Sequence, residues 1–469
     1  MIPVTTFEGR SVAVFGLARS GLDAVRALMA GGARVAAWDD SAPRVDQARE
    51  QGFPVRDLRE MDWDGLDALV LSPGVPLTHP APHWTVEKAT AAGVEIIGDT
   101  ELFFRERAAR DPACAVIAIT GTNGKSTTTA LIGHLIRSAG RAVSVGGNIG
   151  TAVLGLEPFG DDRAYVLELS SYQIDLTPTL APTVGILLNV TPDHLDRHGT
   201  LEHYAAVKAR IAEKAETVVI AVDDDWTRGI ADAAEARGDR VVRVSAREKL
   251  GVGVFVRGTT IVSASGSAET EIADLSGIGA LRGEHNAQNA VAAVAAALAV
   301  GLDPAQIAEG LESFPGLVHR MEEIGRRGKV LFVNDSKATN ADAAARALAS
   351  FETVYWIAGG RAKSGGIAPL KGLFPRVRRA FLIGEAAEDF AMTLGNQVPH
   401  ELSGDLATAV AAAAEAAAND PSNAAEPVVL LAPACASFDQ FADFEARGDA
   451  FRRLVADIDG VTLKSREAA

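Results

Sequence analysis

Residues 120–127 read Thr-Gly-Thr-Asn-Gly-Lys-Ser-Thr, and this stretch decides the class of fold. It follows the apolar run Val116–Ile119 and precedes a helical pattern over Thr128–Ser138. Glycines let the backbone turn tightly, so that N–H groups and a helix N-terminus can face phosphate oxygens. The order of strand, glycine loop and helix predicts an ATP-binding loop with seven contact residues: Gly121, Thr122, Asn123, Gly124, Lys125, Ser126 and Thr127.

Two side chains of this loop have separate expected roles. Lys125 can bridge the β- and γ-phosphates, and the hydroxyl of Ser126 can hold Mg²⁺. The loop departs from the general phosphate-loop pattern at Ile119, where that pattern has glycine. An ordinary glycine-rich turn between a strand and a helix is therefore the alternative interpretation.

The same alternation of short apolar runs and helical patterns continues along the chain, for example at Val12–Phe15 and Val354–Ala358. It predicts an α/β protein with parallel, doubly wound sheets, whose ligands bind beyond the carboxyl ends of the strands. The stretch Val241–Leu275, rich in Val, Thr and Gly, is predicted to form a small β meander. Charged and proline-containing seams divide the chain into three predicted domains: residues 1–110, 111–316 and 317–469.

Composition excludes several classes of function. The chain has 469 residues, 48% of them hydrophobic, and a formal net charge of −16, which argues against nucleic acid or an anionic membrane as partner. Cys114 and Cys435 are the only cysteines, so neither a disulfide framework nor a CxxC metal site is possible. The first ten residues lack an apolar signal core, and no membrane span is predicted. We expect a cytoplasmic protein.

Carboxylate and imidazole groups follow two of the central apolar runs. Glu168 ends such a run, where a buried carboxylate must be paired or bound to a metal, although capping of a nearby helix is an equal alternative. The segment Asn189–His198 holds two histidines and two aspartates. Of these we expect Asp193, Asp196 and His198 to lie in a solvated loop.

Lys208 lies on a predicted helix over Leu201–Ala215, one turn after Tyr204. Taken by itself it is predicted to be a surface lysine. A neutral lysine amine can, however, react with CO₂ to give a carbamate, which would be an oxygen ligand for a second Mg²⁺.

The whole set of motifs resembles the Mur ligase family. In that family's order the chain has the loop at 120–127, Leu-Glu-Leu-Ser-Ser-Tyr-Gln at 167–173, the segment 189–198, Tyr204 to Lys208, Gly-Glu-His-Asn at 283–286 and His319-Arg320. Agreement in order over several motifs is more specific than any one of them. The segments 334–340 and 433–441 most resemble the members that add D-glutamate.

This resemblance implies an ATP-dependent ligase that activates the carboxylate of UDP-N-acetylmuramoyl-L-alanine as an acyl phosphate and joins it to D-glutamate. It implies three domains: a Rossmann-like N-terminal one for the UDP end of the substrate, a central ATPase of the P-loop type, and a Rossmann-like C-terminal one for nucleotide and amino acid. ATP and Mg²⁺, with two ions expected, are the implied cofactors. A monomer is favoured.

The resemblance also implies a role for individual residues. Glu168, His194 and carbamylated Lys208 would serve the metals together with Ser126, and Lys125 would be catalytic. Asn286, Arg320 and Asp335 would face the base and ribose of ATP. Five residues would surround the D-glutamate: Lys337, Thr339, Lys363, Ser437 and Phe444. Asn148 and the segment Ser72-Pro73-Gly74 would meet the uridine diphosphate.

The first predicted domain has a weaker signal. The loop that starts at Gly16 has Ala18 where a dinucleotide motif needs glycine, which argues against a nicotinamide cofactor. Its N–H groups can still face a diphosphate. Asp39 could accept a hydrogen bond from the uracil or ribose of UDP, or it could simply be a turn residue.

Three other functions compete with this interpretation. A folylpolyglutamate synthase or a sister Mur ligase would use a different acceptor. A regulatory module would hydrolyse ATP without an acceptor and would tolerate Lys337→Ala. An NAD-dependent oxidoreductase would bind nicotinamide.

Overall fold

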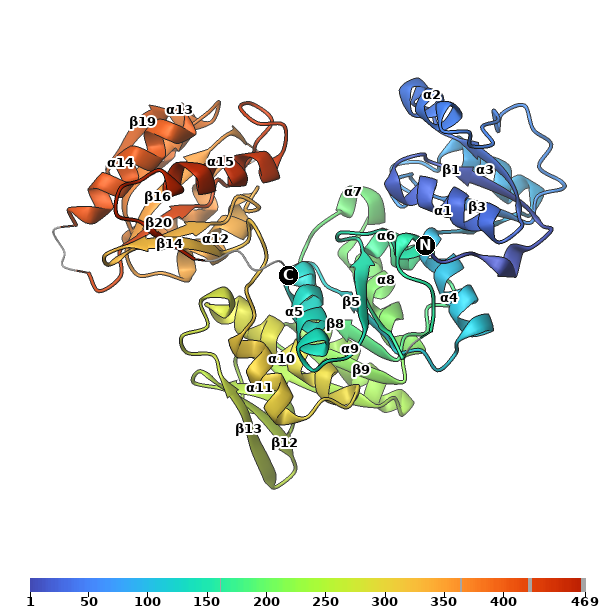
Figure 1. The fold of residues 1–469 in the computed structure, drawn as a ribbon, viewed down its shortest axis with the longest axis horizontal. Coiled ribbons are helices and arrows are strands. Elements are labelled where there is room, and N and C mark those ends of the chain that lie inside the picture. Colours follow the sequence, from blue (N-terminus) through green and yellow to red (C-terminus); the bar gives the residue numbers. More distant parts are fainter. Residues whose placement is uncertain (161, 363–364, 421–423, 465–469) are drawn as a thin grey trace. The chain divides into compact units, whose positions relative to one another are not determined.

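The computed structural model describes residues 1–160, 162–362, 365–420 and 424–464. The chain forms two compact units, and each is described by itself. Unit 1 consists of Met1–Leu275 and Gln288–Glu312, and unit 2 of Ser276–Ala287 and Ser313–Ala469. Both are built on mostly parallel sheets, which confirms the predicted α/β class (Figure 1). Residues 1–110 have a sheet of their own but share a compact unit with the central sheet, so the three-domain bounds stay a prediction.

The first sheet of unit 1 has the strand order β2-β1-β3-β4, all parallel. Its strands and their connecting helices lie within the first 110 residues: η1 (Thr5–Phe7), β1 (Ser11–Phe15), α1 (Arg19–Ala30), β2 (Arg34–Trp38), α2 (Ala42–Glu50), β3 (Ala68–Leu71), α3 (Trp84–Ala92), β4 (Glu95–Ile97) and α4 (Asp99–Arg110). Residues Ala13 and Val14 of β1 belong to different apolar clusters, because alternate side chains of a strand point to opposite faces. Both faces of this sheet are therefore covered.

The second sheet of unit 1 has the order β13-β12-β11-β10-β9-β8-β5-β7-β6. Its strands are β5 (Val116–Thr120), β6 (Val143–Gly147), β7 (Ala164–Glu168), β8 (Val184–Leu187), β9 (Thr217–Ala221), β10 (Val241–Ser245), β11 (Val252–Arg257), β12 (Thr260–Ser265) and β13 (Ala268–Asp274). Every residue of β5, β7, β8 and β9 is buried, as expected for parallel strands covered on both faces.

The helices that accompany this second sheet are α5 (Lys125–Ser138), η2 (Val153–Gly155), α6 (Ser171–Asp175), α7 (Leu195–His198), α8 (Leu201–Glu213), α9 (Asp225–Arg237), α10 (Glu284–Ala299), which belongs to unit 1 from Gln288 onward, and α11 (Pro304–Glu312). Several begin at a side-chain cap that the sequence supplies. Ser170 and Gln173 form a reciprocal capping box at α6, and Thr200 accepts from the N–H of His203 at α8. These caps fix where each helix leaves the sheet.

The predicted meander over Val241–Leu275 is only partly correct. Strands β11, β12 and β13 are antiparallel neighbours, and β12 and β13 extend as a hairpin at the edge of the sheet (Figure 1). Strand β10 instead pairs parallel with β9 and so continues the main sheet. The parallel pairing of β10 with β9 depends on the crossover through α9, which the composition of the stretch does not reveal.

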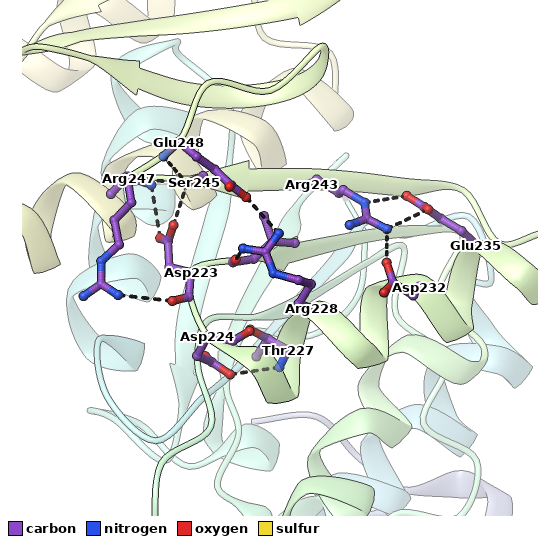
Figure 2. Close-up of polar contacts among 12 residues, drawn as sticks. Asp223, Asp224, Thr227, Arg228, Asp232, Glu235, Arg243, Ser245, Arg247 and Glu248 are labelled. Carbon is purple, nitrogen blue, oxygen red and sulfur yellow. Dashed lines mark hydrogen bonds and ion pairs between the residues drawn. The ribbon is translucent and has the colours of Figure 1, made fainter.

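Polar contacts hold the carboxyl ends of β9 and β10 together (Figure 2). Asp223 accepts from the hydroxyl of Ser245 at 2.5 Å, and Asp224 caps α9 by accepting from the N–H of Thr227 at 2.9 Å. The guanidinium of Arg243 binds Glu235 and Asp232 on the outside of α9. Gln288 of α10 donates to Asp223 at 2.8 Å, which connects this end of the sheet to α10.

Unit 2 has a sheet in the order β19-β18-β16-β20-β15-β14-β22, in which β14 is antiparallel to both neighbours and the other pairs are parallel. Residues 330 to 333 of β15 alternate between two apolar clusters, one on each face. The elements of unit 2 are η3 (Gly279–Leu281), β14 (Glu322–Arg327), β15 (Val330–Asn334), α12 (Ala341–Ala349), β16 (Val354–Gly359), β17 (Arg361–Ala362), η4 (Ala368–Arg376), β18 (Val377–Ile383), α13 (Ala387–Leu394), β19 (His400–Gly404), α14 (Leu406–Ala418), β20 (Val428–Leu431), β21 (Cys435–Ala436), α15 (Phe444–Ala456) and β22 (Thr462–Leu463).

Within the described residues, no helix combines the length and the apolar character that crossing a membrane requires.

Candidate active site

The glycine loop lies between β5 and α5, as the sequence predicts. Gly124 has φ +87° and directly precedes α5, and a Cβ atom added to it would lie 2.2 Å from Oδ1 of Asn289. Gly121 has φ +158°, and a Cβ atom there would lie 2.9 Å from the Cβ of Leu188. Both glycines are thus required by backbone conformation and by close packing. The N-terminus of α5, where anions bind favourably, follows at Lys125.

The side of the loop nearest β8 is held by Asn189. The N–H of Thr122 donates to its carbonyl oxygen at 2.9 Å, and the N–H of Asn123 donates to its Oδ1 at 2.8 Å. Asn189 in turn donates to Gln288 at 3.1 Å. The backbone amides of Thr122 and Asn123 are therefore used to shape the loop, and their contact with a phosphate stays a prediction.

Lys125 folds back over the loop. Its Nζ donates to the carbonyl oxygens of Gly121 and Thr122, both at 2.9 Å. Ser126 is buried in the first turn of α5, with 7% of its surface exposed. The flexible lysine stem lets the ammonium group turn from these carbonyls to a bound phosphate.

Glu168 ends β7, directly beside the strand that leads into the loop, where it pairs with Ile119. Its Oε1 accepts from Nδ2 of Asn148 at 2.9 Å, whereas Oε2 is buried and has no hydrogen-bond partner among the described residues. An unsatisfied buried carboxylate oxygen is costly, and a hard cation such as Mg²⁺ prefers such an oxygen as ligand. The residues therefore fit a metal ion at this place. Asn148, predicted to meet uridine diphosphate, holds the carboxylate in this structure.

Lys208 is buried, with 1% of its surface exposed, so the expectation of a surface lysine from the residue alone was wrong. Its Nζ donates to the carbonyl of Gly121 at 2.9 Å and to Oγ1 of Thr120 at 3.2 Å. It lies 4.7 Å from the ring centre of Tyr204. Burial, together with the charge of Lys125, holds the pKa of this amine well below its usual range. Burial thus favours the neutral, nucleophilic form of this amine.

His194 precedes α7 in a left-handed conformation with φ +53°. Its side chain is about half exposed, lies 3.5 Å from a carboxylate oxygen of Asp193, and packs its ring 5.2 Å from that of Tyr172. The prediction of a solvated loop was wrong for His198. That residue ends α7, has 3% of its surface exposed, and lies 2.9 Å from the hydroxyl of Ser171.

The loops after β1 and β3 approach each other closely at the predicted UDP-binding residues. Gly16 has φ +98°, and a Cβ atom added to it would lie 2.4 Å from Oγ of Ser72, whose hydroxyl donates to the Gly16 carbonyl at 3.0 Å. Asp39 is buried and accepts from the N–H groups of Leu17 at 2.7 Å and Ser41 at 2.8 Å. This carboxylate thus joins its own turn to the loop after β1, and its contact with UDP stays a prediction.

A side chain of α7 joins the loop after β3 to the central sheet. Arg197 donates to the carbonyls of Gly74 and Val75, each at 2.8 Å, and reaches that of Pro73 at 3.5 Å. Sequence reasoning missed this residue because a single arginine in a charged segment has no distinguishing pattern. The contact ties the predicted substrate loop to the short helix that follows His194.

Unit 2 brings together four predicted residues at the carboxyl end of β15. Oδ1 of Asp335 accepts from the N–H of Met321 at 3.2 Å, one residue after Arg320. Burial raises the pKa of Asp335 to about 7, against the opposing effects of this N–H and of Arg320. Nζ of Lys337 lies 3.7 Å from the ring centre of Phe444, the first residue of α15.

The other predicted residues of unit 2 are Thr339, Ser437, Asn286 and Lys363. Thr339 lies two residues after Lys337, and its N–H donates to the Lys337 carbonyl at 2.7 Å. Ser437 is buried directly after β21. Asn286 is buried and donates to the carbonyl of Arg282 at 3.0 Å. Lys363 lies outside the described residues. Sequence reasoning missed Arg447, a buried side chain of α15 that donates to Oγ of Ser336 at 3.0 Å and to the carbonyl of Cys435 at 3.1 Å.

A phosphate loop flanked by a buried carboxylate with one unsatisfied oxygen and by a buried lysine, on a parallel sheet, defines a nucleotide-binding enzyme of the P-loop class. Residues 119–297 match the profile described as the Mur ligase middle domain, and residues 319–435 the one described as the Mur ligase glutamate ligase domain. The chain belongs to the Mur ligase family.

Similar proteins cover almost the whole chain. It is 61% identical to the UDP-N-acetylmuramoylalanine--D-glutamate ligase of Nitrobacter hamburgensis, over 98% of this chain and 99% of that protein. It is 59% identical to the enzyme of the same name from Mesorhizobium japonicum, over 98% of each. The solved structure of UDP-N-acetylmuramate-alanine ligase from Thermotoga maritima covers 95% of this chain and 98% of its own, at 19% identity and a TM-score of 0.57, and so shows likeness of fold.

Proposed function

We propose that this chain is a cytoplasmic ATP-dependent ligase that joins D-glutamate to UDP-N-acetylmuramoyl-L-alanine, giving ADP and phosphate, in the synthesis of peptidoglycan precursors. The observation that carries this proposal is the identity of 59% to 61%, over 98% of the chain, with ligases named for that reaction. Folylpolyglutamate synthase of Mycobacterium tuberculosis resembles the chain at 16% identity only, which concerns the fold and supports no second function.

The proposed chemistry has two steps. An oxygen of the alanyl carboxylate attacks the γ-phosphorus of ATP, ADP leaves, and an acyl phosphate forms. The amine of D-glutamate then attacks the acyl carbon, and phosphate leaves from the tetrahedral intermediate while the amine loses its proton. Phosphorylation is needed because a carboxylate by itself would have to expel an oxide ion.

The residues of unit 1 support the first step. Lys125 neutralises charge on the β- and γ-phosphates as the carboxylate approaches, and the N-terminus of α5 orients them. Glu168, Ser126, His194 and carbamylated Lys208 would hold magnesium, for which two ions are proposed. Bound there, magnesium would neutralise the phosphate charge that repels an attacking carboxylate. The unpartnered Oε2 of Glu168 and the lowered pKa of Lys208 support these assignments.

The remaining residues would bind the other ends of the substrates. Asn286, Arg320 and Asp335 would face the base and ribose of ATP. Lys337 and Lys363 would pair with the carboxylates of D-glutamate, beside Thr339, Ser437 and Phe444. The loops that contain Gly16, Asp39, Asn148 and Ser72-Pro73-Gly74 would meet the UDP portion. The proximity of Lys337 to the Phe444 ring, at 3.7 Å, supports a shared binding place for these two residues.

The experiment is an ADP-release assay in which each substrate is omitted in turn. We expect release only when ATP, UDP-N-acetylmuramoyl-L-alanine and D-glutamate are all present with Mg²⁺. Lys125→Ala should lower kcat/KM by roughly 100-fold or more, as loss of a charge-stabilising contact does in other enzymes. The matched control Lys249→Ala, which removes an exposed lysine paired with Glu269, should leave activity unchanged. ADP release without any acceptor, or release supported by folate or L-lysine, would contradict the proposal.

A further inference from the structure

Three side chains that the proposed reaction does not use come together beside the candidate active site. Asp175 ends α6, His198 ends α7, and His203 lies in the first turn of α8. One ligand atom of each, a carboxylate oxygen and two imidazole nitrogens, lies within 4.8 Å of the other two. They differ in burial: His198 is buried, Asp175 is half-buried and His203 is exposed.

His198 provides the second observation. One ring nitrogen, Nε2, lies 2.9 Å from Oγ of Ser171, whereas the other, Nδ1, is buried and has no hydrogen-bond partner in the part of the chain that the structure describes. If Nε2 carries the proton and donates it to Ser171, the unsatisfied atom is a buried lone pair on Nδ1. Metal-binding histidines have this arrangement, in which a hydrogen bond to one nitrogen fixes the tautomer and orients the other toward the ion. A buried acceptor without a partner is otherwise costly.

We propose that Asp175, His198 and His203 form a site for one divalent transition-metal ion, with Zn²⁺ as the representative ion. Two imidazoles and one carboxylate suit Zn²⁺, whereas Mg²⁺ prefers oxygen ligands. The site is therefore chemically different from the magnesium sites proposed around Glu168. Three protein ligands leave the fourth position to water, and the exposed side of His203 gives the ion a path from solvent.

The geometry needs only a small contraction. Ligand distances near 2.1 Å in a tetrahedral zinc site place the ligand atoms roughly 3.4 Å apart, so atoms now within 4.8 Å must move inward by about 1 Å. His198 is fixed by burial and by stacking on the ring of Tyr172, with centroids 5.5 Å apart. His203 and Asp175 are the more exposed partners, and a change of side-chain rotamer at these two can supply the movement.

Nearby cations oppose a metal ion, and their positions limit the affinity. Arg210 lies 3.6 Å from Oδ1 of Asp175, and Arg197 and Lys208 also face this region. The carboxylate has a second oxygen, so it can bind an ion while it keeps Arg210. In the proposed carbamate form Lys208 is an anion and does not repel the ion.

Bound metal would add a further link between three helices that already meet through packing and through the His198–Ser171 and Arg210–Asp175 contacts. Helix α6 follows Glu168, α7 follows His194, and α8 contains Lys208. An ion held by one residue from each helix would therefore fix the relative positions of three helices, of which α6 and α7 closely follow proposed magnesium ligands and α8 contains one. Its role in this proposal is structural, and the expected effect is on stability.

The test is calorimetric titration of the full chain with Zn²⁺ in saturating Mg²⁺, together with thermal unfolding in the presence and absence of Zn²⁺. We expect one zinc ion per chain and a rise in the unfolding midpoint. His203→Gln should weaken zinc binding at least tenfold and abolish the rise, and it should fold because His203 is exposed. The control Glu202→Gln, an exposed neighbour on the same helix, should bind zinc as the wild type does.

A further variant separates this site from the magnesium sites. Glu168→Gln should keep the zinc stoichiometry, because Glu168 belongs to the other set of ligands. The proposal would be overturned if the wild type bound no zinc in the presence of Mg²⁺. It would equally be overturned if His203→Gln retained the wild-type affinity, or if Glu168→Gln removed the zinc ion.

Discussion

At the scale of the residue, burial shifts the pKa of two side chains, Lys208 and Asp335. The Lys208 amine donates to two oxygens of the β5 end and lies over the Tyr204 ring, with 1% of the residue exposed. Taking an ammonium group out of water favours its neutral form. A neutral amine is what reaction with CO₂ requires, so the burial of this residue is a condition for the proposed carbamate.

Carbamylation of Lys208 predicts that activity depends on dissolved CO₂. Enzyme dialysed in CO₂-free buffer should lose most of its ADP release, and bicarbonate should restore it. Lys208→Arg should be inactive under both conditions, because the guanidinium group stays protonated and cannot form the carbamate. Activity that is independent of bicarbonate, measured after complete dialysis, would rule out the modification.

Asp335 predicts a dependence of stability on pH. Its pKa in the folded chain is about 7, above the ordinary 3.8, so the folded state binds more protons than the unfolded state between these values. The free energy of unfolding should therefore fall as pH rises from about 4 to about 7. Asp335→Asn keeps an oxygen for the Met321 N–H and removes the titration. Urea unfolding at pH 5 and pH 8 should show a smaller loss in the variant, and equal losses would contradict the assignment.

At the scale of elements, the glycine loop is positioned by the segment after β8 and by α10. Asn189 of the segment after β8 accepts from two of its amides, and Asn289 of α10 lies against Gly124. Gln288 extends this contact to Asp223 after β9. The loop is thus fixed from strands and a helix that are far apart in sequence, which explains why its conformation needs glycine at two positions.

The packing of the loop predicts that two glycine substitutions lower the free energy of unfolding by different amounts. Gly124→Ala and Gly140→Ala both place alanine at a positive φ, +87° and +76°, but only the first puts a Cβ atom against another side chain. Because the backbone strain is shared, the overpacking at Gly124 should make Gly124→Ala lower the free energy of unfolding by about 1–3 kcal/mol more than Gly140→Ala. Chemical denaturation of the two variants measures the difference. Equal losses would mean that Asn289 does not restrict the loop.

The elements near the site also show what the sequence could and could not predict. The strand before the glycine loop, the helix after it and the strand end at Glu168 follow from apolar patterns and turn residues. The burial of Lys208 and His198 does not, because it depends on packing of α7 and α8 against strands and helices distant in the chain. The positions of β10 and Arg197 depend on tertiary pairing in the same way.

At the scale of the whole molecule, the two compact units carry different parts of the proposed reaction. Unit 1 holds the phosphate loop and the candidate metal ligands, and unit 2 holds Asp335, Lys337 and Phe444. Neither set contains every group that the two-step chemistry needs. The proposed acceptor accordingly rests on similarity over 98% of the chain, whereas the proposed phosphoryl chemistry is supported by the geometry of unit 1.

The central claim is that the terminal phosphoryl group of ATP passes to a substrate carboxylate. It is tested most directly with UDP-N-acetylmuramoyl-L-alanine whose alanyl carboxylate is labelled with ¹⁸O at both oxygens, followed by mass spectrometry of the products. Phosphate released during ligation to D-glutamate should contain one labelled oxygen, and the new amide should keep the other. Phosphate without label, formed together with the ligated product, would contradict an acyl phosphate and with it the proposed mechanism.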